Sequence, residues 1–229
     1  MEYPHNRPYT ADDLVRIITL LRDPVNGCPW DKVQTHTSIR MNFLEEAYEA
    51  VDALDLDDPV LMCEELGDVL MQVAFHTCME QETGRFTWEQ VCDGVCQKLI
   101  ERHPNIFGTQ PGYEGITDWD ALKNKEKGRC TLADDLESVP RAMPALMRAA
   151  KLQKRAARHG AALQGADAAA LADAAENLQT AQPASAQAEQ AVGKLLFAAA
   201  NLARQAGVDP EQALQKANEA FCTAAGPVA

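Results

Sequence analysis

Apolar side chains recur at helical spacing along the first half of the chain, and turn-forming residues separate the segments that carry them. Capping residues at the starts of these segments, and glycine or proline at their ends, predict four helices, at about 10–22, 38–56, 59–84 and 87–102. No segment shows the alternation of β-branched residues between turns that would indicate a hairpin. We therefore predict an all-α fold.

The predicted helix at 59–84 combines a broad apolar surface with one narrow polar stripe. Its apolar residues cover one side of the helix: Cys63, Leu66, Val69, Leu70, Val73 and Ala74. Its polar residues follow a single line, at i, i+3, i+7 and i+11: Glu65, Asp68, Gln72 and His76. We expect this helix to be buried on most faces, and buried carboxylates without partners are costly.

The predicted helix at 38–56 carries a second set of acids. Its apolar face is formed by Leu44, Ala47, Tyr48, Val51 and Leu54, and its acids are Glu45, Glu46 and Glu49. Two antiparallel helices joined at Pro59 would bring Glu46 and Glu49 opposite Glu65 and Asp68, with no lysine or arginine spaced to pair with them. Four such carboxylates repel unless a divalent cation lies between them, and oxygen-only ligands favour Mg²⁺ or Mn²⁺.

Two other interpretations of these acids stay open at this point. Clustered acids on one helix usually form a solvated face, but a second acidic pair on a mostly apolar helix favours the metal interpretation. A di-iron carboxylate bundle also draws acids from facing helices, and it uses Glu-x-x-His pairs. Here the i+3 partners are Glu49 and Asp68, and His76 lies too far along to complete that motif.

Composition and charge exclude several classes of function. The net charge of −13 over 229 residues argues against binding to a nucleic acid polymer, because its phosphates would be repelled. The longest apolar run, 195–200, is far shorter than a membrane span. The N-terminus lacks the apolar region of a secretory signal, and the seven cysteines form no Cys-x-x-Cys pair. We therefore expect a cytoplasmic protein without membrane contact.

Charge and alanine content also change along the chain. Residues 1–130 hold 24 acids and 12 bases, whereas residues 131–229 hold 10 acids and 9 bases and are rich in alanine, with 32 of 99 residues. Pro140 and Pro144 follow soon after the change. We predict two domains, 1–130 and 131–229.

Several short motifs resemble the MazG family of nucleoside triphosphate pyrophosphohydrolases: GCPWD (27–31), EEAYE (45–49), EELGD (64–68), HPNIFG (103–108), PALMRAAKLQKRAA (144–157) and LQKANEAF (214–221). The resemblance implies four-helix-bundle-like units that use Mg²⁺ to split the α–β phosphate link of a nucleoside triphosphate. The products would be a nucleoside monophosphate and pyrophosphate. It also implies a homodimer.

The resemblance assigns roles to particular residues. It implies metal ligation by Glu46, Glu49, Glu65 and Asp68, with Glu45 orienting a water or supporting the ligands. It implies substrate contacts from Lys98, Arg102, Trp119 and Lys123, the first two directed at the phosphates. Residues of these types also occur as surface charges at a helix end or as packing anchors, so both interpretations stay open for the substrate contacts.

The C-terminal part looks like a degenerate copy of the first. The segment 65–76 aligns with 191–202 without gaps, which sets Ala191 against Glu65 and Lys194 against Asp68. Aligning EEAYE with ENLQT (176–180) places Asn177 and Thr180 where the first copy has glutamates. We therefore predict that residues 131–229 are not catalytic and serve packing, dimerisation or regulation. Partial disorder of residues 160–190 is an alternative.

Two classes of function follow from these observations. The favoured hypothesis is an enzyme that hydrolyses excess or non-standard nucleoside triphosphates. The alternative is a non-catalytic helical module that binds nucleotides or proteins, which the loss of acids from the second copy suggests. A relative that acts on dUTP or phosphoribosyl-ATP would share the chemistry, but GCPWD and HPNIFG are closer to the MazG family.

Overall fold

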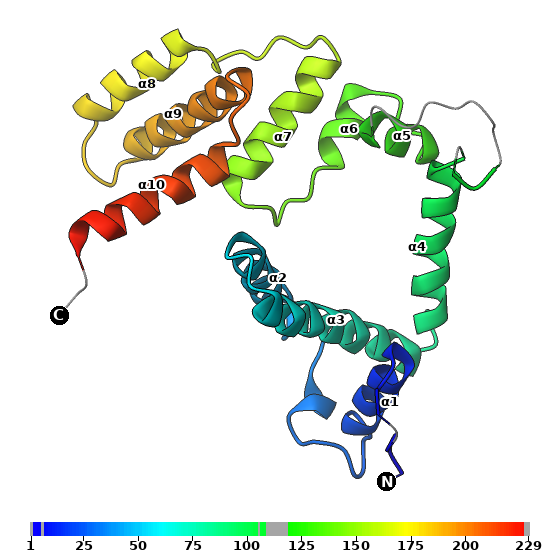
Figure 1. The fold of residues 1–229 in the computed structure, drawn as a ribbon. Helices are drawn as coiled ribbons and strands as arrows, with labels where there is room; N and C mark the ends of the chain where they lie inside the picture. The colour runs from blue at the N-terminus through cyan, green and yellow to red at the C-terminus, as the bar shows by residue number, and fades with distance from the viewer. Residues whose placement is uncertain (1, 6, 105, 109–118, 227–229) are drawn as a thin grey trace. The chain divides into compact units, whose positions relative to one another are not determined.

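Helices provide all the regular structure in the described part of the computed structural model, residues 2–5, 7–104, 106–108 and 119–226 (Figure 1). In chain order they are α1 (Ala11–Leu21), the 3-10 helix η1 (Asp31–Val33), α2 (Arg40–Asp55), α3 (Pro59–Glu82), α4 (Trp88–Arg102), α5 (Trp119–Glu126), α6 (Leu132–Glu137), α7 (Ala145–Arg158), α8 (Ala168–Thr180), α9 (Ala186–Gln205) and α10 (Pro210–Ala225). The all-α prediction is confirmed. Over the described residues, none of these helices has both the length and the apolar character needed to cross a membrane.

The chain packs as two compact units, Met1–Ile116 and Thr117–Ala229. The first unit contains α1 to α4, and the second contains α5 to α10. Packing therefore places the start of α5 with the C-terminal helices, whereas the boundary expected from composition lies near residue 130. The catalytic and non-catalytic roles assigned to the two parts stay predictions.

Local capping explains where the helices of the first unit begin. Thr10 caps α1 through a capping box, in which its hydroxyl accepts from the N–H of Asp13 and the Asp13 carboxylate accepts from the N–H of Thr10. Thr87 caps α4 in the same way with Gln90. These starts agree with the predicted helix limits because caps act over three or four residues and are visible in the sequence.

The hydrophobic core of the first unit lies where α1 and the start of α4 meet the second half of α3. Its buried members are Val15, Ile18, Ile39, Ala74, Phe75, Cys78, Met79 and Trp88. Fully burying side chains of this size stabilises a fold by about 1.5–3 kcal/mol each, so the second half of α3 anchors the unit.

The expectation that α3 is buried on most faces is wrong for its first half. Leu66 is 53% exposed and Leu70 is 40% exposed, and Tyr48, Val51 and Leu54 on the apolar face of α2 are exposed as well. The reason is that α2 packs along α3, whereas α4 begins in the core at Trp88 and then extends away from the pair (Figure 1). One chain therefore leaves an apolar surface on this helix pair.

Alanine allows close packing in the second unit. Helices α8 and α9 form its most extensive helix pair, with buried alanines at 174, 191, 198 and 200. Small side chains bring helix axes close together and lose no rotamer entropy on burial. Partial disorder was an alternative for residues 160–190, and it is wrong for the segment that forms α8.

Candidate metal centre

The connection between α2 and α3 fixes how the two helices face each other. Helix α2 ends at Asp55, and Pro59 occupies the first position of α3, where its missing N–H costs no hydrogen bond. The Asp58 carboxylate accepts hydrogen bonds from the N–H groups of Val60 and Leu61 and caps α3. This short link reverses the chain direction, so α2 and α3 run antiparallel and their acidic faces meet.

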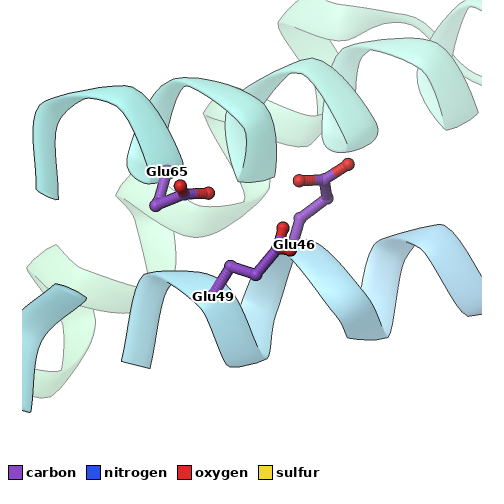
Figure 2. Close-up of side chains that lie close together, drawn as sticks. All are labelled: Glu46, Glu49 and Glu65. Atoms are coloured by element: carbon purple, nitrogen blue, oxygen red, sulfur yellow. The ribbon is translucent and has the colours of Figure 1, made fainter. Parts of the chain in front are cut away.

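Three carboxylates converge between these helices. Glu46 and Glu49 extend from α2 and Glu65 extends from α3 into the space between them (Figure 2). Each offers one oxygen, and the three oxygens lie within 4.8 Å of one another. Such an all-oxygen set from two rigid helices fits a hard divalent cation such as Mg²⁺.

The electrostatics of the cluster reflect its shared negative charge. Burial and the charge of Asp68 raise the pKa of Glu46, and Glu49 adds to the effect. Burial and the charges of Glu49 and Asp68 raise the pKa of Glu65. The charges that act on both groups belong to neighbouring carboxylates, which is the arrangement that a bound cation relieves.

The other two predicted acids lie beside the cluster rather than inside it. Asp68 is half-buried on α3, one turn beyond Glu65, and its charge reaches both Glu46 and Glu65. Glu45 is exposed on α2. The structure therefore brings together three of the four predicted ligands directly and places the fourth close by.

A glutamine that received no role from the sequence contacts the cluster. The Nε2 atom of Gln72 donates to Oε1 of Glu46 over 3.4 Å, and Gln72 is buried. Its position on the same stripe as Glu65 and Asp68 was visible in the sequence, but the partner on α2 was not. This hydrogen bond orients the Glu46 carboxylate towards α3.

The same stripe ends in a histidine pair that the sequence did not predict. The rings of His36 and His76 stack, and their Nδ1 atoms are 2.7 Å apart. Nε2 of His36 lies 2.5 Å from Oε1 of the buried Glu80, which also pairs with Arg85. Burial lowers the pKa of His76, and the charge of His36 lowers it further. His76 thus connects the segment before α2 to α3 instead of joining the carboxylates.

Comparison with known proteins identifies the family of this helix pair. The model of the MazG nucleotide pyrophosphohydrolase domain matches residues 34–107. A nucleoside triphosphate pyrophosphohydrolase of Escherichia coli is 41% identical over 219 residues, covering 92% of this chain and 83% of that protein. The nucleoside triphosphate pyrophosphohydrolase/pyrophosphatase MazG of Thermotoga maritima is 38% identical over 212 residues, covering 92% and 82%. The chain belongs to the MazG family.

The MazG domain contains every acid of the candidate centre. The match at 34–107 spans α2, α3 and α4, and so includes the carboxylate cluster, Gln72, Lys98 and Arg102. A nucleoside triphosphate pyrophosphohydrolase of Mycobacterium tuberculosis is 34% identical over 154 residues, covering 66% of this chain and 46% of that protein. The family resemblance drawn from the sequence motifs is thereby confirmed.

The predicted substrate-binding residues of this MazG chain lie on α4 and α5, outside the helix pair that carries the cluster. Lys98 is exposed on α4 and Arg102 lies half-buried in its last turn, and α4 extends away from the α2–α3 pair (Figure 1). Lys123 is exposed on α5 in the second unit, and the side chain of Trp119 lies outside the described residues. Their contacts with substrate stay predictions.

The helix pair of the second unit lacks an equivalent acidic cluster among the described residues. Lys194, aligned with Asp68, is exposed on α9 and lines a hollow of about 780 Å³ together with Asn177 and Asp173. Within the described ranges, the one group of three or more potential metal ligands is the set on α2 and α3. That α8 and α9 are a degenerate copy of α2 and α3 stays a prediction.

Proposed function

We propose that this MazG-family chain is a Mg²⁺-dependent nucleoside triphosphate pyrophosphohydrolase that cleaves the α–β phosphate link and releases a nucleoside monophosphate and pyrophosphate. The convergence of Glu46, Glu49 and Glu65 within 4.8 Å on two facing helices carries the proposal. The names of its relatives, at 38–41% identity over most of the chain, support a hydrolase acting on acid anhydrides. Its role would be to clear excess or non-standard nucleotides from the cytoplasm.

The donor set fits magnesium, with manganese as a second choice. The ligands we assign are Glu46, Glu49, Glu65 and Asp68. When bound, magnesium supplies positive charge that balances the triphosphate and increases the acidity of nearby water. Gln72 holds Glu46 in place through its hydrogen bond and keeps the carboxylate aimed at the metal position.

The remaining steps use side chains of the chain itself. Glu45 or Glu49 accepts a proton from the attacking water, since a carboxylate at the edge of the cluster has access to solvent. Lys98 and Arg102, four residues apart on α4, bind the phosphates and offset the charge on the departing pyrophosphate. Trp119 and Lys123 contact the base and a phosphate.

A homodimer completes this arrangement. The exposed apolar residues Leu66 and Leu70 on α3 and Val95 and Leu99 on α4 need a covering surface, and a second copy of the first unit offers the same residues. Helix α4 extends away from the α2–α3 pair of its own chain. In the dimer, the α4 helix of the second copy would therefore face the cluster. The second unit, without an acidic cluster among its described residues, serves association or regulation.

Substitution of single ligands tests the proposal. Glu49→Gln and Asp68→Asn each keep the size of the side chain and remove a negative charge, so we expect pyrophosphate release from mixed nucleoside triphosphates with Mg²⁺ to fall by at least about 100-fold. The fold should persist or gain stability, because like-charge repulsion is relieved. Circular dichroism and thermal unfolding measure the fold, and a coupled pyrophosphate assay measures turnover.

A matched acid outside the cluster provides the control. Asp52→Asn on the exposed side of α2 should leave turnover within about twofold. Undiminished turnover in Glu49→Gln and Asp68→Asn would contradict the site. Absence of pyrophosphate release by the unaltered chain with Mg²⁺ and Mn²⁺ would instead favour the non-catalytic binding module.

A further inference from the structure

The second unit contains a hollow that gathers three positive charges in an acidic protein. Lys151 and Lys154 on α7 and Arg204 at the end of α9 line a cavity of about 590 Å³. The loop from Gly207 to Asp209 and the start of α10 close one side. The net charge of the whole chain is −13, so this concentration of cations runs against the overall composition.

Arg204 is held in place by a buried polar contact. Its Nε and Nη2 atoms donate to Oδ1 of Asn201 over 3.0 and 2.8 Å. Asn201 is only 2% exposed, and its Nδ2 atom donates to the carbonyl of Ala166 over 2.7 Å. A guanidinium has five N–H donors, so the bonds to Asn201 fix its plane and leave the other donors for a ligand. The cation at this edge of the hollow is thus preorganised.

One carboxylate, that of Asp209, also lines the hollow, and both it and the nearby Glu211 accept hydrogen bonds from backbone amides. Asp209 accepts from the N–H groups of Glu211 and Gln212 and caps α10. Glu211 accepts from the N–H of Met147 in the first turn of α7. Their charge is directed at helix N-termini, where it is already stabilised. The oxygens of these two carboxylates that form these bonds are thus directed at backbone amides rather than at Lys151 or Lys154.

We propose that this hollow binds a diphosphate or triphosphate group without a metal. The three cations of the lining outnumber its one carboxylate, and a linear polyphosphate has enough charged oxygens to contact all three cations, which a single carboxylate does not have. The planar guanidinium of Arg204 suits two oxygens of one phosphate, and the two lysines suit the next phosphate along. The ligand is either free pyrophosphate or the phosphate tail of a nucleotide. The inference does not depend on the carboxylate centre.

Titration calorimetry on the full chain in EDTA tests the proposal without involving the metal centre. The probes are inorganic phosphate, pyrophosphate and ATP. We expect pyrophosphate to bind more tightly than phosphate and to weaken as salt increases. The variant Lys151→Gln with Lys154→Gln should lose at least about tenfold in pyrophosphate affinity, because two charge-assisted contacts disappear. Lys194→Gln removes a lysine of the same unit that lies outside this hollow and should change the affinity by less than about twofold.

The results of the titrations distinguish the two ligands and can overturn the proposal. Equal affinities for pyrophosphate and ATP would identify free diphosphate as the ligand, and tighter ATP binding would identify a nucleotide. No pyrophosphate binding by the unaltered chain would overturn the proposal, and so would equal weakening by Lys194→Gln, which would indicate a general charge effect. If circular dichroism shows that the double variant is unfolded, the single change of the exposed Lys154 to Gln makes the same comparison.

Discussion

Asp135 shows how one side chain can join three helices. It has no exposed surface and lies 2.7 Å from Nη2 of Arg158, 3.0 Å from Nη1 of Arg155 and 3.1 Å from Nε2 of His159. Burial acts to raise its pKa, but hydrogen bonds from Asn124, Arg158 and His159 outweigh that effect and lower the pKa from 3.8 to about 2. Asp135 thereby connects α6 to α7 and to α5.

Removing this carboxylate should destabilise the second unit strongly. Asp135→Asn keeps the shape but removes the negative charge that pairs with Arg155, which is only 6% exposed. We expect the free energy of unfolding to fall by about 3 kcal/mol, the scale for breaking a buried ion pair. Urea unfolding followed by circular dichroism measures the loss. Asp173→Asn, an exposed acid on α8, should change stability by less than about 0.5 kcal/mol.

The pH dependence of stability, compared between the unaltered chain and Asp135→Asn, gives a second measure of the contribution of this carboxylate. Because the folded-state pKa of Asp135 is depressed, its stabilisation is present in full above 3.8 and is lost as the pH falls through about 2. The shift corresponds to about 2 kcal/mol. The difference between the unaltered chain and Asp135→Asn should therefore narrow below pH 4. A constant difference down to pH 2 would contradict the assignment.

The turn between α1 and η1 shows how a short element can depend on one glycine. The Asp23 carboxylate accepts from the N–H groups of Val25 and Asn26, and the N–H of Gly27 donates to the carbonyl of Asp23. A Cβ on Gly27 would lie 2.4 Å from the carbonyl oxygens of Leu21 and Asp23, which are backbone atoms. The turn therefore has no space for a side chain at this position.

A methyl group added at Gly27 should destabilise the fold, whereas one added at Gly193 inside α9 should stabilise it. Gly27→Ala must move backbone, so we expect a loss of at least about 2 kcal/mol in the free energy of unfolding. Gly193→Ala in α9 meets nothing within 4 Å, and the higher helix propensity of alanine should stabilise by about 0.5–1 kcal/mol. Thermal unfolding of both variants measures the expected loss and the expected gain in stability. A neutral Gly27→Ala would show that the turn relaxes without cost.

At the scale of the whole molecule, the proposed dimer would cover apolar side chains that a single copy of the first unit leaves exposed. Exposed apolar side chains lie on three of its helices, with Leu54 on α2, Leu66 on α3 and Leu99 on α4. Exposed apolar residues become interaction sites in soluble proteins where they gather into a patch. The single chain buries the second half of α3 well and leaves the first half, which carries the carboxylate cluster, covered on one side by α2.

A charge placed on this surface should prevent dimer formation. We expect the unaltered chain to sediment as a dimer and Leu54→Lys to shift it to the monomer at micromolar concentration, because a lysine would be buried at the interface without a partner. Val25→Lys, on a side chain that is 79% exposed in the turn after α1, should leave the dimer unchanged. Analytical ultracentrifugation measures both. A monomeric unaltered chain would contradict the proposed assembly.

The candidate centre was largely predictable because its residues belong to periodic helices. Glu46, Glu49 and Glu65 follow helical spacing on segments whose order and link are written in the sequence, so their convergence could be expected. Two contacts could not be expected from the sequence: the hydrogen bond from Gln72 to Glu46 and the pairing of His36 with His76. Each joins positions on different segments and depends on the rotation of one helix about its axis.

The sequence by itself determined the four helices of the first unit, the family and the positions of the acidic residues on those helices, because these depend on patterns within a few residues of one another. Only the tertiary structure decided that Asp68 lies beside the three clustered glutamates, that the first half of α3 stays exposed, and that Asp135 joins three helices. These features arise from contacts between residues distant in the chain. Hydrophobic periodicity shows which face of a helix is apolar, but it does not show which other helix, or which copy of the chain, covers that face.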